Sequence, residues 1–374
     1  MIASVAATVI ARIGVGWICD RVGPRRTYSW LLILSSLPVM GIGLAHDYES
    51  FLLCRLLIGC IGASFVVTQY HTSVMFAPNC VGTANATVAG WGNLGGGVTQ
   101  VAMPLLLALL VGGLGLTQAT GWRACMAIVG AACFVMGLVY HRYAPEAPPK
   151  KKPTTSADHG SSATSVLADP RVWSLTAIYG ACFGLELTID NVAVLYFHDY
   201  FGLSVAAAGA VAAAFGGMNL FARALGGWLS DQFQRRWGTQ ARVTWLFLAL
   251  FCEGLALMLF SQLQSVTAAV VMLATFGLFV KMSNGATYSV VPFVRREQLG
   301  MVSGIVGAGG NVGAVLAGFL FKSSLGWPTA FLILGFAVTL CSFATFVVRL
   351  EPAPQPELSD RSALPDLATA ASSI

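Results

Sequence analysis

Two arginines stand inside apolar segments of this chain, and each belongs to the same short sequence frame. The frame Ala-Arg-x-x-x-Gly-Trp-x-x-Asp occurs around Arg12 and again, 211 residues later, around Arg223. A guanidinium group in hydrocarbon costs roughly 2.5–3.5 kcal/mol on insertion scales, so an arginine in such a place is a functional candidate. Two of them at matching positions predict one anion held between two pseudo-symmetric halves.

Composition and hydropathy indicate an integral membrane protein. Of the 374 residues, 56% are hydrophobic and only 10% are charged, whereas ordinary soluble domains carry about 25% charge. About eleven apolar stretches approach the roughly 20 residues that a helix needs to cross a bilayer. Backbone polar groups in lipid must be satisfied within the segment, so we expect an all-α membrane protein. The stretches lie near 1–19, 28–45, 50–76, 82–112, 121–141, 172–199, 204–230, 243–261, 266–293, 298–321 and 327–348.

The charges between these stretches predict their orientation. Cations gather in alternate connections, and the intervening connections are nearly free of them. By the positive-inside rule, the cationic connections and the C-terminus lie in the cytoplasm, beside a plasma or cytoplasmic membrane. The net charge of +5 follows from this topology and does not indicate a nucleic-acid partner. The cationic connections contain Arg21, Arg25 and Arg26, then Arg142 and Lys150 to Lys152, then Arg235, Arg236 and Arg242, and finally Arg295 and Arg296.

One long polar interruption, residues 142–171, divides the chain into two parts. Its proline, serine and lysine content predicts a cytoplasmic linker between an N-terminal helix bundle at 1–141 and a C-terminal bundle at 172–348. The proline- and alanine-rich tail at 349–374 is expected to be disordered. Eleven spans place Met1 on the outer side, so we interpret the chain as lacking the first helix of a twelve-helix plan.

The sequence contains no pattern that indicates an enzyme, a cofactor or a metal. Its nine cysteines include no Cys-x-x-Cys pair, which is typical of small apolar packing residues rather than a metal site. Gly90-x-Gly92-x-x-Gly95 has the spacing of a dinucleotide fingerprint, but that motif requires a preceding strand and here lies in an apolar helix. We also find no nucleophile–base pair in a credible context.

A second repeat follows the first in the same order. Gly-Asn-x-Gly occurs at 92–95 and again at 310–313. Parallel repeats of this kind form one of the two common transporter architectures, with the substrate near the bilayer midplane where the halves meet. Glycines three and four residues apart make a flat helix face for close packing, and the amides of Asn93 and Asn311 can donate to an anion. The glycines expected to pack helices are Gly90, Gly92, Gly95, Gly96, Gly309, Gly310 and Gly313.

The segments 16–26 and 227–238, which end the two arginine frames, resemble the cytoplasmic signature of the major facilitator superfamily. An aspartate at a helix end, near a cluster of arginines, can pair across helices and lock one gate until the opposite state releases it. The alternative is a solvated basic loop that only sets topology. The residues expected to form the gate are Asp20, Arg21, Arg25 and Asp231.

The segments 89–100 and 283–314 narrow this resemblance to the nitrate/nitrite porter family, over the chain from Arg12 to about residue 348. The resemblance implies two helix bundles, alternating access and a nitrate clamped between Arg12 and Arg223. A guanidinium fits two oxygens of planar nitrate with two parallel donors. The resemblance also implies that Asn93, Tyr179 and Phe65 line the cavity. Two alternatives stay open: the two aromatic residues serve packing alone, or the arginines pair with Glu186, Asp190 or Glu253.

Energetics predict how transport is coupled. Importing an anion against an inside-negative potential costs about 2.3 kcal/mol per 100 mV, so net uptake requires co-transported cations, whereas nitrate/nitrite exchange does not. Glu186 and Asp190 lie on one helix face and are the expected proton carriers, unless they pair with Lys281. We expect proton-coupled uptake of nitrate, and of nitrite as well. The alternatives are a nitrate/nitrite antiporter and a transport-inactive nitrate sensor or partner-binding membrane protein; nothing in the sequence identifies an accessory membrane subunit.

Overall fold

The computed structural model describes residues 2–147, 163–322 and 325–350. Within these residues the regular structure is entirely helical, as the sequence predicts. Nine helical stretches of this described part are long and apolar enough to cross a membrane. The helices α1 (Ile2–Val22) and α5 (Val81–Ala108), which carry Arg12 and the first Gly-Asn repeat, are not among the nine. The chain is a multi-pass integral membrane protein.

Every predicted stretch corresponds to a helix, some of them with a short 3-10 or π segment. The N-terminal half adds, besides α1 and α5, the elements α2 (Pro24–Gly41), η1 (Ile42–Leu44), α3 (Tyr48–Gly59), η2 (Cys60–Ala63), α4 (Ser64–Met75), η3 (Leu109–Gly113) and α6 (Gln118–Tyr143). The C-terminal half contains α8 (Pro170–Asp199), α9 (Val205–Gly217), η4 (Met218–Leu220), α10 (Ala222–Trp237), α11 (Ala241–Ser261), α12 (Val266–Val290), η5 (Val291–Phe293), α13 (Leu299–Lys322), α14 (Trp327–Ser342) and η6 (Phe343–Val347). A short helix, α7 (Ala163–Leu167), precedes it.

The predicted linker is partly helical at both ends. Helix α6 runs to Tyr143, and α7 and the start of α8 lie before residue 172. Pro170 suits the first turn of α8, because the missing N–H would have no partner there, and the Asp169 side chain caps the helix by accepting from the Arg171 amide. Residues 148–162 of the predicted linker and 351–374 of the predicted tail lie outside the described residues.

Two spans are broken where the arginines lie. A 3-10 turn, η2, interrupts the α3–α4 span, and η4 interrupts the α9–α10 span immediately before Arg223. Breaks in a helical ladder release backbone groups that side chains must satisfy when no water is present. The carbonyl of Gly62, within η2, is used in this way by Arg12.

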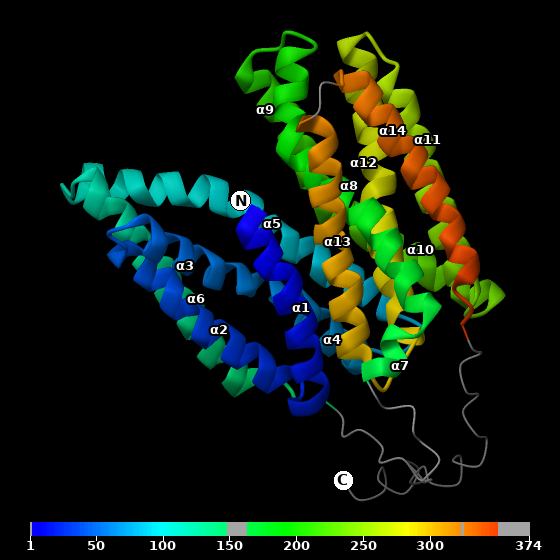
Figure 1. Cartoon of the computed structure of the whole chain (residues 1–374), viewed down its shortest axis with the longest axis horizontal. Helices are drawn as coiled ribbons and strands as arrows, with labels where there is room; N and C mark the ends of the chain where they lie inside the picture. Colours follow the sequence, from blue (N-terminus) through cyan, green and yellow to red (C-terminus); the bar gives the residue numbers. More distant parts are fainter. Residues whose placement is uncertain (1, 148–162, 323–324, 351–374) are drawn as a thin grey trace, which may run out of the picture.

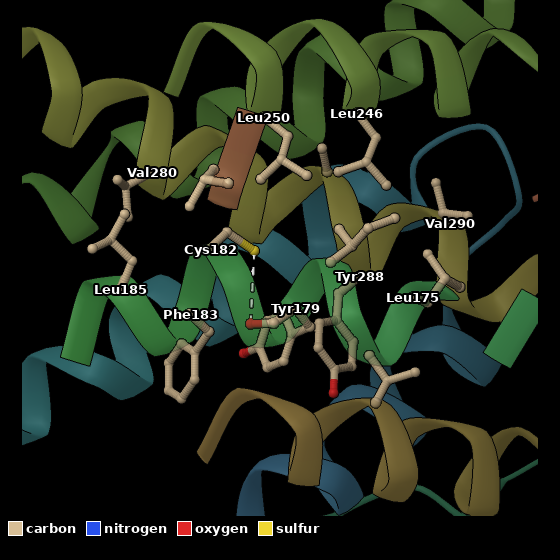
Figure 2. Packing of buried hydrophobic residues seen from close by; sticks show 14 of the residues in the cluster. Leu175, Tyr179, Cys182, Phe183, Leu185, Leu246, Leu250, Val280, Tyr288 and Val290 are labelled. Atoms are coloured by element: carbon tan, nitrogen blue, oxygen red, sulfur yellow. Dashed lines mark hydrogen bonds between the residues drawn. The ribbon is translucent and has the colours of Figure 1, made fainter. Parts of the chain in front are cut away.

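The most continuous apolar core lies in the C-terminal half, around α8. Figure 2 shows Leu175, Cys182 and Leu185 of α8 packed with Leu246 and Leu250 of α11 and with residues of α12. Helix α8 also packs extensively along α13. The helices that carry the second Gly-Asn repeat and Tyr179 are therefore held rigidly against each other.

The two halves meet mainly through two helix pairs, and α5 with α12 and α4 with α13 add further contacts. Helix α1 packs along α13, and α5 packs along α10. In Figure 1 the two halves converge near α4 and α7, and they diverge toward the opposite end, where α9 begins. The converging end carries the arginine-rich connections that follow α1 and α10.

Candidate functional site

Arg12 lies on α1 and bridges the two halves. Its side chain is 5% exposed. Its Nε donates to the carbonyl of Gly62 at 3.2 Å, and its Nη1 donates to the carbonyl of Gly307 on α13. The guanidinium carbon also lies 5.3 Å from the ring centroid of Phe65. The predicted proximity of Arg12 and Phe65 is therefore present in the structure.

Arg223 lies in the first turn of α10 and is fully buried. Its Nη2 donates to the hydroxyl of Tyr179 at 3.3 Å, which joins two residues that the resemblance places in the cavity. Within the described part of the chain, its Nε and Nη1 have no hydrogen-bond partner. Neither Arg223 nor Arg12 forms an ion pair with a described acid. Two donors of a buried cation thus remain available to an anion.

The two arginines share one aromatic ring. The guanidinium carbon of Arg12 lies 5.8 Å from the ring centroid of Phe183, and that of Arg223 lies 5.6 Å from the same centroid. A cation over an aromatic face is attracted by the ring quadrupole. Because Arg12 and Arg223 come from different halves, Phe183 is the point where the two cationic side chains meet.

Phe183 belongs to an aromatic cluster that we define as Phe65, Tyr179, Phe183 and Tyr288. The rings of Tyr179 and Phe183 stack at 4.9 Å, and the ring of Tyr288 meets those of Phe65 and Tyr179 edge-on. In Figure 2 the side chains of Tyr179, Phe183 and Tyr288 point to the same side, away from Leu246 and Leu250. This cluster surrounds the guanidinium groups with apolar surface and excludes water from them.

Sequence reasoning missed Phe183 and Tyr288. Phe183 lies four residues after Tyr179, a spacing that puts both on one helix face and could have identified it. Tyr288 gives no comparable signal, because its place depends on the packing of α12 against α8 and α13. Its hydroxyl donates to the carbonyl of Ser303 on α13 at 3.1 Å.

Glycines of α13 make room for the site. A Cβ on Gly307 would lie 3.0 Å from the Tyr288 hydroxyl and 3.5 Å from Arg12, and one on Gly310 would lie 2.6 Å from the ring of Phe183. Gly309 and Gly313 pack directly on α8, and Gly90 of α5 packs on Asn219 of η4 and on the start of α10. The predicted packing role is observed at these four glycines of the predicted set: Gly90, Gly309, Gly310 and Gly313.

The same prediction is wrong for Gly92 and Gly95 in this conformation. A Cβ at either position would have no atom within 4 Å, because this face of α5 points into open space. The surroundings of Gly96 lie outside the described residues.

The two asparagines predicted to bind the anion, Asn93 and Asn311, differ in their burial and surroundings. Asn93 is half-buried on α5, and within the described residues its side chain has no hydrogen-bond partner. Asn311 is 6% exposed and follows Gly310, which faces the aromatic cluster. Its Nδ2 has no partner in the described part of the chain. Only Asn311 is therefore a buried donor beside the cluster in this conformation.

Glu186 is an ion-paired residue. It is 1% exposed, and its Oε1 lies 2.8 Å from the Nζ of Lys281. Asn219 and Asn284 donate to its two oxygens at 2.8 and 2.5 Å. Its carboxylate is thus held in the charged form by three donors, so the alternative of a pair with Lys281 is observed. Asp190, the other predicted proton carrier, is exposed at the surface of α8.

Two aspartates at the converging end contact helix N-termini of the opposite half. The carboxylate of Asp20 accepts from the amides of Gly300 and Met301, in the first turn of α13, at 3.1 and 2.8 Å. These unpaired amides carry partial positive charge, which favours an anion there. Asp20 of one half thereby caps a helix of the other half.

Asp231 repeats this arrangement in the opposite direction. Its carboxylate accepts from the amides of Gly82 and Thr83, in the first turn of α5, at 3.1 and 2.7 Å, and from the Thr83 hydroxyl. It is also paired with Arg242 at 2.6 Å, and both side chains are buried. We call the Asp20 and Asp231 contacts together the gate.

Arg21 and Arg25, the arginines that follow Asp20, make contacts within their own half. Arg25 donates to the carbonyl of His141 and pairs with Glu146 at 2.9 Å, so it contacts the end of its own half. Arg21 lies 3.7 Å from the ring centroid of Trp17 on its own helix. The two aspartates contact backbone amides of the opposite half, and Asp231 also pairs with Arg242 across α10 and α11.

Comparison with known proteins gives a consistent family. A sequence profile of the "Major Facilitator Superfamily" matches residues 1–308. The chain is 36% identical over 350 residues to the "High affinity nitrate transporter 2.5" of Arabidopsis thaliana, covering 91% of this chain and 70% of the relative. It is 27% identical over 430 residues to the "Nitrate/nitrite transporter NrtP" of Nostoc punctiforme, covering 94% of this chain and 84% of the relative.

A solved structure supports the fold. The E. coli fucose:proton symporter FucP superposes with a TM-score of 0.72 at 13% identity, covering 93% of this chain and 90% of that one. At this identity the likeness concerns the arrangement of helices alone.

Proposed function

Because this chain belongs to the nitrate/nitrite porter family of the major facilitator superfamily, we propose that it transports nitrate, and also nitrite, across a membrane by alternating access. The relatives named as nitrate transporters support the substrate. The helix bundles at 1–141 and 172–348 move against each other, with the arginine-rich end and the C-terminus in the cytoplasm of a cell bounded by a plasma or cytoplasmic membrane. The gate is closed at that end, so the conformation corresponds to an outward-facing state.

The observation that carries this proposal is the buried donor set of Arg223 opposite Arg12. The Nε and Nη1 of Arg223 lack partners in the described residues, and both guanidiniums lie over Phe183. A planar, singly charged oxyanion offers acceptors that match these donors, and Asn311 supplies a further one. An arginine that served only packing in this core would instead have its donors satisfied by an acid or by backbone carbonyls.

The arginine pair also suggests how substrate drives the switch. Two unit charges about 10 Å apart repel by roughly 1.7 kcal/mol at an effective dielectric constant of about 20. An anion between them replaces this repulsion with attraction on both sides. Binding of nitrate therefore draws Arg12 and Arg223, and with them the two halves, toward a closed intermediate.

We propose that nitrate uptake is coupled to protons, in preference to nitrate/nitrite exchange. Net uptake of an anion against an inside-negative potential needs an accompanying cation. The C-terminal half contains three buried ionisable side chains that could take part in this coupling: Glu186, Lys281 and Glu253.

The test is nitrate flux in proteoliposomes containing the purified full chain. We expect nitrate uptake that rises when the outside is made more acidic, and that does not require nitrite inside. Uptake only with nitrite inside would favour the antiporter. Nitrate binding without flux would favour the transport-inactive sensor.

A further inference from the structure

Glu253 is a buried acid that the arginine site does not use. It lies near the middle of α11 and is 0% exposed. Neither of its carboxyl oxygens has a hydrogen-bond partner in the described part of the chain. Burying an isolated carboxylate is very costly, whereas a protonated carboxyl costs far less. The geometry therefore requires a proton on Glu253 in this conformation.

Among the described residues, Lys281 is the cation that interacts with Glu253, and it is already paired with another acid. Lys281 and Ser283 of α12 lie close enough to Glu253 to interact with its carboxyl group. The carboxylate of Glu186 on α8 does so as well. Lys281 is paired with Glu186. Two acids thus compete for one lysine, and the acid without the lysine must be neutral.

In the part of the chain that the structure describes, the other neighbouring elements bring no second cation to Glu253 itself. Helix α14 contributes the thiol of Cys341, and α8 also contributes the thiol of Cys182. Helix α10 contributes Arg223, which acts on Glu186, and η6 carries no titratable side chain. The hydroxyl of Ser283, itself without a partner in the described residues, lies close to Glu253.

Glu253 is linked electrostatically to the arginine site through α8. Glu186 connects the two, because its carboxylate interacts electrostatically with both Arg223 and Glu253. Phe183, which both arginines contact, is the next residue after Cys182. A proton on Glu253 raises the positive charge of the half that holds Arg223. It therefore favours anion binding, and by reciprocity a bound anion favours the proton.

We propose that Glu253 is the residue that carries the coupled proton. Its carboxylate takes a proton from water on the outer side, holds it while the site is dry, and returns it to water on the cytoplasmic side. Release follows when the opposite conformation hydrates the carboxyl or shifts Lys281 away from Glu186. This assignment rests on the proposed nitrate transport, and it replaces Glu186 and Asp190 as carriers.

The decisive variant is Glu253→Gln, because an amide has the shape of the protonated acid and keeps the packing of α11. In proteoliposomes we expect it to keep nitrate/nitrite counterflow and to lose nitrate accumulation driven by a pH gradient. Glu49→Gln, at an exposed acid of α3, is the matched control and should accumulate nitrate as the unmodified chain does. If Glu253→Gln still accumulated nitrate in response to a pH gradient, the assignment would be overturned. It would also be overturned if Asp190→Asn lost this accumulation and Glu253→Gln kept it.

A second measurement does not depend on nitrate flux. Infrared spectra of the purified chain near neutral pH should contain the carbonyl stretch of a protonated carboxyl that Glu253→Gln lacks. An unchanged spectrum in Glu253→Gln would overturn the proton assignment even if nitrate is transported. Absence of nitrate flux in the unmodified chain would instead overturn the proposed function, with the infrared result still deciding the state of Glu253.

Discussion

Arg12 and Arg223 come from opposite halves of the chain, yet their guanidinium groups lie 5.8 and 5.6 Å from the centroid of one ring, that of Phe183. Arg12 uses its donors on backbone carbonyls of α13 and of the η2 break. Arg223 keeps two donors unpaired within the described residues. The two sites of the repeat are therefore related by sequence but not equivalent: Arg12 joins the halves, and Arg223 presents donors.

This difference predicts unequal effects of lysine at the two positions. Arg223→Lys removes the two parallel N–H donors of the guanidinium group. Loss of a charge-assisted hydrogen bond worth about 1.5–3 kcal/mol corresponds to roughly 10- to 100-fold weaker nitrate binding. Arg12→Lys should also lower transport, and in addition should loosen the α1–α13 contact. Nitrate binding and uptake by each variant measure both effects.

The control is Arg21→Lys, because Arg21 packs on Trp17 outside the cavity. It should bind nitrate like the unmodified chain. Normal nitrate affinity in Arg223→Lys would exclude the clamp.

The glycines of the two repeats predict opposite outcomes for the same substitution. A Cβ on Gly313 would overlap the backbone of Gly180 on α8, and neither helix backbone can move aside easily. Overpacking of this kind costs typically 1–3 kcal/mol, so Gly313→Ala should lower the thermal unfolding temperature in detergent. Gly92→Ala meets open space and should unfold as the unmodified chain does.

Gly92→Ala nevertheless gives a second readout. We expect the open face of α5 to pack against a neighbour when the outer end closes, so this variant should slow transport while remaining stable. Equal thermal stability of Gly313→Ala and the unmodified chain would contradict the packing argument.

The gate predicts a shift between conformations. In Asp231→Asn the charge that faces the first turn of α5 is lost, and Arg242 stays buried without its partner carboxylate. The outward-facing state should lose stability relative to the inward-facing one. A cysteine placed at Gly92, on the open face of α5, should then react more slowly with a membrane-impermeant thiol reagent in the Asp231→Asn background.

Asp20→Asn should act in the same direction with a smaller effect, since Asp20 is less buried than Asp231. Asp47→Asn, at an exposed cap of α3, is the matched control. Unchanged labelling in both gate variants would show that these contacts do not lock the end of the molecule.

The sequence predicts the spans well because hydropathy and the bilayer thickness fix them. Within the described residues all eleven stretches are helical, and Tyr179 contacts Arg223 while Phe65 contacts Arg12. What the sequence cannot predict depends on contacts between distant segments. Phe183 joins the arginines only because α1 and α10 approach α8 together, and Glu186 is paired because α12 brings Lys281 beside it.

The junction of the linker with α8 predicts a pH dependence outside the membrane. Burial of Asp169 opposes its ionisation, but hydrogen bonds from Arg171 and Arg295 outweigh it and lower the pKa of Asp169 to about 2. A carboxyl whose pKa is lower in the folded state contributes stability above its unfolded pKa, near 3.9. That contribution is lost as the pH falls toward the folded pKa of about 2.

Asp169→Asn should therefore unfold at a lower temperature than the unmodified chain at neutral pH, and the two unfolding temperatures should converge as the pH is lowered from about 4 toward 2. Thermal unfolding in detergent across this range measures the difference directly. Glu146→Gln is a suitable comparison, because Glu146 is exposed and contacts only Arg25 among the described ion pairs. A constant difference between Asp169→Asn and the unmodified chain across the range would mean that Asp169 stabilises the junction by shape rather than by charge.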